Sequence, residues 1–207
     1  MSSISKISYA DAVSSRRSIY ALSASSPIPD SRIVELVQEA VKHSPSSFNS
    51  QSSRAVVVFG EHHHFVWGAV KDAIKAVVPD EEAWKKSEER LNGFDAAYGT
   101  VLLFEDSKVV QGLQEKLPLY KDKFPEWAGH AHGALAVNIW TSLEAEGLGA
   151  NLQHYNPLID AKIEAEFDIP STWLLTAQLV FGKKEGEPYP KEFQPVEERV
   201  KVFGAKQ

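Results

Sequence analysis

The sequence predicts a helix–sheet–helix sandwich around a small sheet. Three runs of apolar and β-branched residues, at 54–60, 99–106 and 171–182, have the length and composition of buried strands. Stretches with apolar residues at helical spacing separate these runs along the chain. Strands that alternate with helices favour helices packed on both faces of a sheet. The strands are few and widely spaced, so a mixed or an antiparallel sheet is compatible with them.

Apolar stripes identify the helices. In residues 30–43, Ile33, Val37 and Ala40 fall on one face, and Asp30 has the residue type of an N-cap. A short helix is expected to end near the arginines at 16–17. The same periodicity that predicts the helix over 30–43 predicts further helices over 61–78, 81–94, 107–117 and 126–147.

Composition and charge exclude several classes of protein. The chain has no internal repeat and no break in composition, so residues 1–207 are expected to form a single domain. A net charge of −6 argues against a nucleic-acid partner, because phosphate binding requires a basic face. No apolar run has the length of a membrane span, and the first residues lack a signal-peptide core. We therefore expect a cytoplasmic protein without a membrane partner, with entry into the nucleus left open.

The residue types present leave little scope for catalysis by the protein alone. The chain contains no cysteine, which excludes disulfides, cysteine nucleophiles and cysteine-ligated iron–sulfur clusters. It also contains no GxSxG, HExxH or GxxxxGK[ST] motif. A redox role would therefore need a cofactor that carries out the chemistry itself.

Histidines occur as a run at 62–64 and again at 130 and 132. Consecutive residues on a helix point about 100° apart, so neighbouring histidines cannot converge on one ion. We therefore expect these histidines to be solvated or to lie at the start of a helix, and no metal site is predicted.

Three polar stretches are candidate binding segments. SSRRS (14–18) places two arginines at a helix end, which suits a phosphate but equally suits a plain surface patch. SPSSFNSQSSR (44–54) is a flexible linker, a polar loop, or an ordered loop whose Asn49 and Gln51 amides meet a flat heterocycle. In an extended loop these two amides would point the same way. GLGAN (147–151) lacks the context of a dinucleotide fingerprint and favours a helix C-cap at Gly147.

The order of these stretches resembles that of the FMN-dependent nitroreductase family. RRS, then SPSSFNSQ before the first strand, then EGLGA (146–150) at a helix end, follow the family's order between about Tyr9 and Phe203. LQHYNP (152–157) and KEFQPVEERVKVFG (191–204) are similar to a short branch of the family. That branch includes fungal proteins linked to fatty-acid repression and bacterial stress-induced nitroreductases.

The resemblance implies two groups of FMN-binding residues near the N-terminus. Arg16, Arg17 and Ser18 match the family's phosphate-binding RRS. Asn49 and Gln51 match amides that family members aim at the flavin ring and ribityl chain.

Further cofactor-binding residues are implied in the second half of the chain. The segment after Gly149, with Gln153 and His154, corresponds to backbone that lies near flavin N5 and O4 in the family. Lys191 matches a late phosphate-binding lysine, and Arg199 is the candidate for a second tail cation. No protein side chain is implied as a catalytic acid or base.

The sequence departs from the usual family pattern in three places, one of which is a pair of residues. Tyr20 stands where many members have a third basic residue, and Phe193 stands where a tail arginine is frequent. Ser52 and Ser53 replace a common Pro-Trp pair, and we interpret this pair as a mark of the branch rather than a site.

The resemblance also implies an assembly and an activity. Family members are α+β homodimers with FMN at the dimer interface, and the tail 183–207 is expected to wrap across the partner. NADH or NADPH would reduce the flavin, and a nitroaromatic, quinone or related acceptor would reoxidise it in a ping-pong reaction. Aromatic residues that either line the acceptor side or pack in the core are Phe48, Tyr120, Phe124 and Trp127. The alternative is a flavin-binding regulator or redox sensor with slow turnover.

Overall fold

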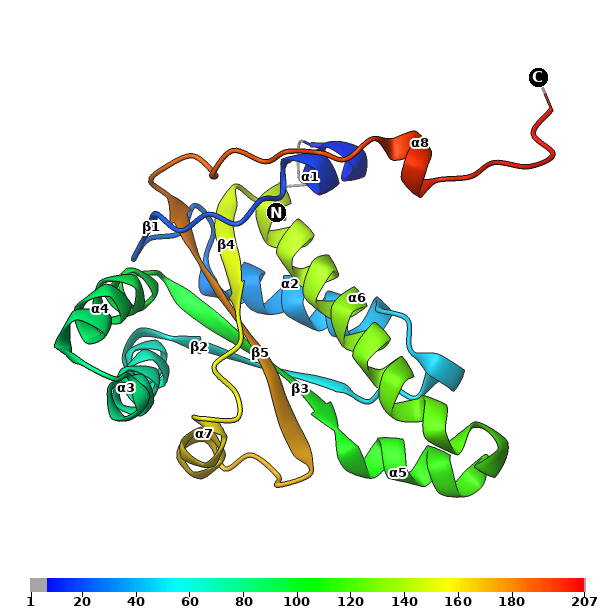
Figure 1. The fold of residues 1–207 in the computed structure, drawn as a ribbon, viewed down its shortest axis with the longest axis horizontal. Coiled ribbons are helices and arrows are strands. Elements are labelled where there is room, and N and C mark those ends of the chain that lie inside the picture. Colours follow the sequence, from blue (N-terminus) through cyan, green and yellow to red (C-terminus); the bar gives the residue numbers. More distant parts are fainter. Residues whose placement is uncertain (1–6, 207) are drawn as a thin grey trace.

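A five-stranded sheet forms the centre of the structure, a computed structural model that describes residues 7–206 (Figure 1). Strands β1, β5, β3 and β2 are neighbours in that order, and β4 pairs with β5. All of these pairings are antiparallel, so the sheet is antiparallel rather than mixed. The strands are β1 (Leu22–Ser23), β2 (Ser53–Phe59), β3 (Gly99–Asp106), β4 (Leu148–Gln153) and β5 (Trp173–Lys184).

Helices α1 to α6 lie where the apolar periodicity predicts them, to within about two residues at each end, whereas α7 and the single turn α8 are not predicted. Asp30 is the first residue of α2 rather than its N-cap, and its carboxylate accepts a hydrogen bond from the Tyr98 hydroxyl at 2.5 Å. The α-helices are α1 (Tyr9–Ser15), α2 (Asp30–His43), α3 (Gly60–Val77), α4 (Glu81–Asp95), α5 (Ser107–Lys116), α6 (Phe124–Ala145), α7 (Asp160–Phe167) and α8 (Val196–Arg199). Two short 3₁₀ segments are η1 (Ser47–Asn49) and η2 (Pro118–Lys123).

Two hydrophobic clusters cover the two faces of the sheet, which confirms the helix–sheet–helix layering and the α+β class. Along β3, Leu102 and Phe104 pack with residues of α3, α4 and α7. The intervening Val101 and Leu103 pack with residues of α2 and α6. This alternation follows from the two-residue repeat of a strand. Figure 1 shows α3, α4 and α7 on one side of the sheet and α2 and α6 on the other.

Two strands differ from the sequence-based expectation. β2 is predicted to be buried on both faces, but it lies at one end of the strand order, and Val58 is its one buried residue. β4 is not indicated by its sequence, LGANLQ, which contains no β-branched residue. Gly147 ends α6 with a left-handed φ of 87°, as the predicted C-cap requires, and the chain then pairs with β5. The partner strand, not local propensity, makes β4 a strand.

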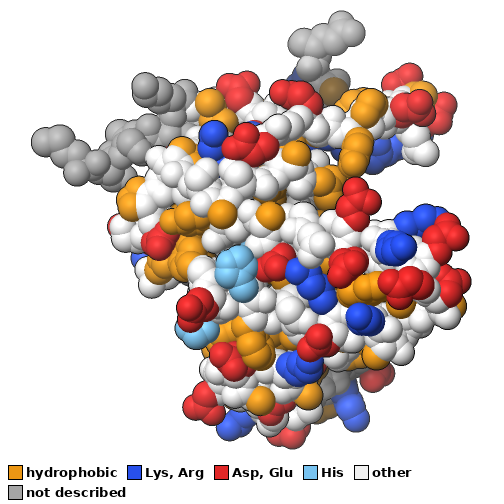
Figure 2. Space-filling model, turned by 90° about the vertical axis from the view of Figure 1, so that its left-hand side faces the viewer, with side chains coloured by type: hydrophobic (Ala, Val, Ile, Leu, Met, Phe, Trp, Pro, Cys, Tyr) orange, Lys and Arg blue, Asp and Glu red, His pale blue; other side chains and the backbone are white. Residues whose placement is uncertain are grey.

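The surface is mixed in charge, and the charged tail also exposes several large apolar side chains. Figure 2 shows acidic and basic side chains interspersed over one face of the molecule. The tail after β5 leaves the body and extends past α8 (Figure 1). Its large side chains are exposed, for example Tyr189 at 72%, Phe193 at 75% and Phe203 at 92%. Between residues 7 and 206, no helix has both the length and the apolarity needed to cross a membrane.

Candidate functional site: an arginine pair beside β4 and a strained loop

The arginine pair at the end of α1 keeps its charge available. The Arg16 guanidinium lies 4.4 Å from the centre of the Trp140 ring, and Arg17 Nη2 donates to the Tyr189 carbonyl at 2.6 Å. In the described part of the chain, neither arginine forms an ion pair with a carboxylate. An aromatic face and a neutral carbonyl orient these cations without neutralising them. Two adjacent guanidinium groups of this kind can bind an anion such as a phosphate.

The segment after the arginines is fixed to β4 by hydrogen bonds. Ser18 forms a parallel bridge with Ala150, and Ile19 N donates to the Ala150 carbonyl at 3.0 Å. The buried Asn151 side chain donates to the Ile19 carbonyl at 2.9 Å. Gln153 Nε2 then donates to Asn151 Oδ1 at 2.8 Å. The structure therefore brings the predicted Ser18 and Gln153 into one hydrogen-bonded unit through Asn151, a residue that the sequence gives no reason to select.

Gly149 is required for this close approach. A Cβ atom added to it would lie 2.9 Å from Leu22 Cδ2, 2.8 Å from Lys184 Cγ and 3.1 Å from Ile19 Cβ. The absent side chain lets the 19–22 segment and β5 pack against β4. The structure thus gives Gly149 a packing role, and its contact with a cofactor stays a prediction.

The end of β4 presents further polar groups. His154 is exposed just beyond the strand. Gln178 is fully buried on β5, and its Oε1 accepts a hydrogen bond from Tyr155 N at 2.8 Å. Gln178 Nε2 has no hydrogen-bond partner among the described residues. A buried donor without a partner is uncommon, and it marks the Gln153–Tyr155 turn as a place where an acceptor would be favoured.

Of the two predicted tail residues, Lys191 lies just after the part of the tail that contacts the arginine pair, and Arg199 lies farther along the chain. The Tyr189 ring centroid is 5.6 Å from that of Tyr20, and the Tyr189 carbonyl binds Arg17. Tyr20, where many members have a basic residue, thus helps to hold the tail. Lys191 follows two residues later, with its Nζ 5.1 Å from the Phe193 ring centroid. Arg199 lies farther along the tail, on α8, and no contact joins it to the arginine pair.

The loop between α2 and β2 is ordered but not extended, so the extended geometry in which its two amides would point the same way does not apply, and their contact with a flavin stays a prediction. Phe48, Asn49 and Gln51 have left-handed φ values of 53°, 51° and 52°. Such values are uncommon for residues other than glycine and are typical of functional loops. The Asn49 and Gln51 side chains are exposed, and Gln51 N donates to Ser46 Oγ at 3.0 Å.

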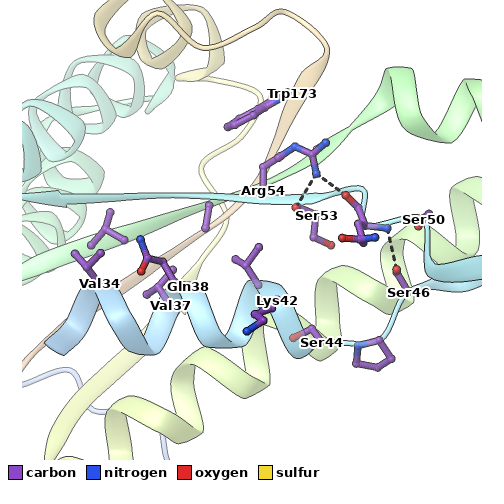
Figure 3. A pocket seen from close by; sticks show the side chains of 15 residues that line it. Val34, Val37, Gln38, Lys42, Ser44, Ser46, Ser50, Ser53, Arg54 and Trp173 are labelled. Atoms are coloured by element: carbon purple, nitrogen blue, oxygen red, sulfur yellow. Dashed lines mark hydrogen bonds between the residues drawn. The ribbon is translucent and has the colours of Figure 1, made fainter. Parts of the chain in front are cut away.

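Hydrogen bonds to two acidic residues hold this loop in place. The buried Ser52 hydroxyl donates to Glu105 Oε2 at 2.7 Å, and the Ser53 hydroxyl donates to Glu105 Oε1. Arg54 donates to the Gln51 carbonyl and to Asp106 Oδ2, the latter at 3.0 Å. Figure 3 shows Arg54 linking β2 to the loop. Ser52 and Ser53 therefore have a structural role that the sequence did not reveal.

Burial raises the pKa of Glu105, while the Ser52 and Ser53 hydroxyls and nearby Arg54 lower it; burial is the larger effect. The one sequence signal for the contact between Glu105 and the two serines is the acidic end of the β3 run, GTVLLFED, opposite the polar start of β2.

Four aromatic residues form a cluster beside the loop. The Phe48 ring centroid lies 5.8 Å from those of Tyr120 and Phe124 and 6.2 Å from that of Trp127. Phe48 is 59% exposed, whereas Phe124 is 1% exposed. Phe124 is therefore a core residue, and Phe48 presents an aromatic surface whose contact with an acceptor stays a prediction.

The predicted site residues form two groups that lie far apart along α6. The arginine pair contacts Trp140 near the end of this helix, and the loop contacts Trp127 near its start. Thirteen residues of helix separate the two tryptophans, a distance of roughly 20 Å at 1.5 Å per residue. A groove of about 910 Å³ also lies beside the loop, between α2 and β2, and Gln51 and Arg54 line it (Figure 3).

The histidine run contains one buried member. His63 Nδ1 lies 2.9 Å from Thr100 Oγ1, and His63 Nε2 lies 3.2 Å from the Asp95 carbonyl. Burial lowers the pKa of His63 to about 4. Ligand atoms of His63, His64 and Asp95 converge within 4.8 Å, which the helix argument did not anticipate because Asp95 comes from α4. Both His63 nitrogens are engaged, and Lys71 Nζ lies 2.7 Å from Asp95 Oδ2, so this cluster is a hydrogen-bonded one.

Comparisons with known proteins agree with this fold. The Nitroreductase family model matches residues 13–183. HBN1 of Saccharomyces cerevisiae is 38% identical over 197 residues, which cover 94% of this chain and 96% of that protein. The nitroreductase CinD of Lactococcus lactis, solved with 4-nitrophenol, is 41% identical, with a TM-score of 0.85 over 95% of this chain and all of that one.

A more distant structure shares the fold alone. A nitroreductase from Desulfitobacterium hafniense DCB-2, solved with bound FMN, is 16% identical, with a TM-score of 0.67 over 95% of this chain and 98% of that one. The family match and the identity to HBN1 define the class: the chain belongs to the nitroreductase family, a family of oxidoreductases.

Proposed function

We propose that this protein is an FMN-dependent NAD(P)H oxidoreductase that reduces nitroaromatics, quinones or related acceptors. The observation that carries the proposal is the arginine pair, whose two guanidinium groups are oriented beside β4 without a carboxylate partner. Membership of the nitroreductase family, the FMN bound to the D. hafniense protein and the 4-nitrophenol bound to CinD support it.

The residues present fit FMN. Arg16 and Arg17 would offer charge-assisted hydrogen bonds to a phosphate, and Ser18 a neutral one; Lys191, two residues after the Tyr189 carbonyl that binds Arg17, would join them. Donors at the β4 end, including the unpartnered Gln178 Nε2, favour a ligand with carbonyl-type acceptors, as a flavin ring has. Gly149, Gln153 and His154 would form or support this side of the site, and Arg199 would add charge only if the tail moved.

A homodimer accounts for the two separate groups of site residues. Asn49 and Gln51 lie at the far end of α6 from the arginine pair, so one chain does not bring them to the same phosphate and ring. A second copy would supply the loop of the partner to each site. The exposed Tyr189, Phe193 and Phe203 support a tail that is buried against that partner.

When bound, FMN would supply hydride transfer, taking electrons from NADH or NADPH and then passing them to the acceptor in a ping-pong sequence. The chain's own residues would bind and orient. The arginines would hold the phosphate end, and amide groups of the loop and β4 would hydrogen-bond the ring. Phe48, with Tyr120 beside it, would give a flat acceptor an aromatic surface. Water would supply protons, so no side chain is assigned as acid or base.

The first experiment is a visible spectrum of the purified protein, followed by anaerobic addition of NADH and NADPH separately. A yellow protein whose absorbance bleaches supports the proposal, and a colourless protein that gains no absorbance with added FMN contradicts it. With a quinone as acceptor, a turnover rate of about 10 per second would be that of an ordinary enzyme. Turnover below about one per minute would favour the redox sensor instead.

The phosphate assignment has its own test. Arg16→Ala and Arg17→Ala should each weaken FMN binding by about 10- to 100-fold, because each removes a charge-assisted hydrogen bond of about 1.5–3 kcal/mol. Lys85→Ala, at an exposed position on α4, is the matched control. Unchanged FMN retention in both arginine variants would remove the assignment.

Removal of residues 188–207 should yield a monomer by light scattering if the tail holds the dimer together.

A further inference from the structure

Arg54, near the start of β2, binds the main chain of Gln51 from the far side of the loop. Its guanidinium donates through Nη1 to the Gln51 carbonyl and through Nη2 to Asp106 Oδ2, the latter at 3.0 Å. The same group lies 5.5 Å from the centre of the Trp173 ring (Figure 3). The side chains of Arg54 and Asp106 are 28% and 11% exposed, so their ion pair is partly shielded from solvent. A planar guanidinium fork of this kind fixes two acceptors at once.

The Asp106 carboxylate is itself held in place. Its Oδ1 accepts a hydrogen bond from Lys108 N at 3.1 Å, as the N-cap of α5. The main-chain N–H of Asp106 donates to the Ser52 carbonyl at 2.9 Å, directly after Gln51. Arg54 therefore connects the loop to a fixed corner of the fold, where β3 ends and α5 begins.

Gln51 needs such support because its backbone is strained. Its φ of 52° is left-handed, and a residue other than glycine keeps such a value only where surrounding contacts hold it. Side chains bind both of its main-chain polar groups: Ser46 Oγ accepts from its N–H at 3.0 Å, and Arg54 donates to its carbonyl. Its side-chain Nε2 lies 3.5 Å from the Asn49 carbonyl oxygen. The direction of the Gln51 amide thus follows from a backbone that these contacts hold.

We propose that Arg54 is a positioning residue for the cofactor, which keeps Gln51 in the backbone conformation that aims its amide at the flavin. This inference rests on the proposed function, since it takes Gln51 as a flavin contact. Arg54 is assigned no contact with FMN, because the ion pair, the Gln51 carbonyl and the Trp173 ring already orient its guanidinium. Loss of Arg54 would lower the fraction of FMN-free protein whose loop is in the binding conformation, and the apparent affinity falls by the same factor as that fraction.

Titration of the FMN-free protein with FMN, followed by the flavin fluorescence, tests this role. Arg54→Met removes the donors and should weaken FMN binding about tenfold, as expected if the binding conformation falls to about a tenth of the population. In a Gln51→Gly background the amide is absent and glycine adopts a left-handed φ freely, so Arg54→Met should then change the affinity by less than about twofold. Lys108→Met, which removes an exposed cation at the start of α5, is the matched control and should bind FMN as the wild type does.

A second variant keeps the test decisive if Arg54→Met does not fold. Arg54→Lys keeps the charge beside Asp106 but has one nitrogen in place of the fork, so it should melt as the wild type does and still bind FMN at least about threefold more weakly.

Three results would overturn the inference. Wild-type FMN affinity in the folded Arg54 variants would do so while leaving the proposed function intact. An equal loss of affinity with and without the Gln51 side chain would show that Arg54 does not act through Gln51. A wild-type protein that binds no FMN would overturn the proposed function and this inference together.

Discussion

Replacement of Glu105 by alanine should destabilise the protein by about 3 kcal/mol. The carboxylate accepts hydrogen bonds from Ser52 and Ser53, and Ser52 is only 1% exposed. Without the carboxylate, the Ser52 hydroxyl is left buried and unpaired, which costs about 1–3 kcal/mol. The second lost hydrogen bond and the space left behind add about 1 kcal/mol. For a chain of this length, the melting temperature should fall by about 6–12 °C.

Urea unfolding of wild type, Glu105→Ala and the control Glu115→Ala measures this effect. Glu115 is exposed on α5, so its replacement should change the unfolding free energy by no more than about 0.5 kcal/mol. A Ser52→Ala/Glu105→Ala double-mutant cycle then isolates the contact, and the two losses should overlap by about 1–2 kcal/mol. A loss below about 1 kcal/mol for Glu105→Ala, or losses that simply add, would refute the anchoring role of Glu105.

The pH dependence of Glu105→Gln gives the same reasoning a second check. Burial raises the pKa of Glu105 above its unfolded value, so the native state retains this proton after the unfolded state has lost it. Between these two pKa values the native state binds more protons, and its stability falls as pH rises. The glutamine variant lacks this dependence. The stability deficit of Glu105→Gln relative to wild type should therefore be largest at acid pH and shrink toward neutral pH.

Two further predictions concern a buried histidine and a glycine. Burial lowers the pKa of His63 to about 4, so the unfolded state binds the proton first as pH falls, and stability should drop between about pH 6.5 and 4. The unfolding free energy, measured with urea, should fall by about 3 kcal/mol over this pH range. The control variant His62→Ala should show the same pH dependence as the wild type. A His63→Asn variant that also shows it would contradict the assignment to His63. Gly149→Ala would place a Cβ 2.9 Å from Leu22, so it should lower the melting temperature by several degrees, an overpacking effect of about 1–3 kcal/mol. Gly112→Ala, on α5 with open space around it, should be neutral or stabilising, and equal effects of the two substitutions would show that Gly149 is not closely packed.

The sequence by itself determined the elements whose apolar pattern is long and regular. β3 and β5 are continuous apolar runs, and α2 carries a clear stripe, so burial in any compact fold selects the same faces. It also determined which residue types were available for binding: two adjacent arginines, a pair of amides and no cysteine. These are properties of neighbouring residues, and they need no knowledge of what packs against them.

Only the tertiary structure decided how these pieces meet. β4 is a strand because β5 pairs with it, and Gly149 is needed because Leu22 and Lys184 approach it from elsewhere in the chain. The serines after Gln51 anchor the loop because Glu105, 53 residues away from Ser52, lies opposite them on the neighbouring strand β3. The predicted site divided into two groups because α6 sets their separation. Long-range contacts of this kind leave no periodic trace in the sequence, since each depends on a partner that local spacing does not specify.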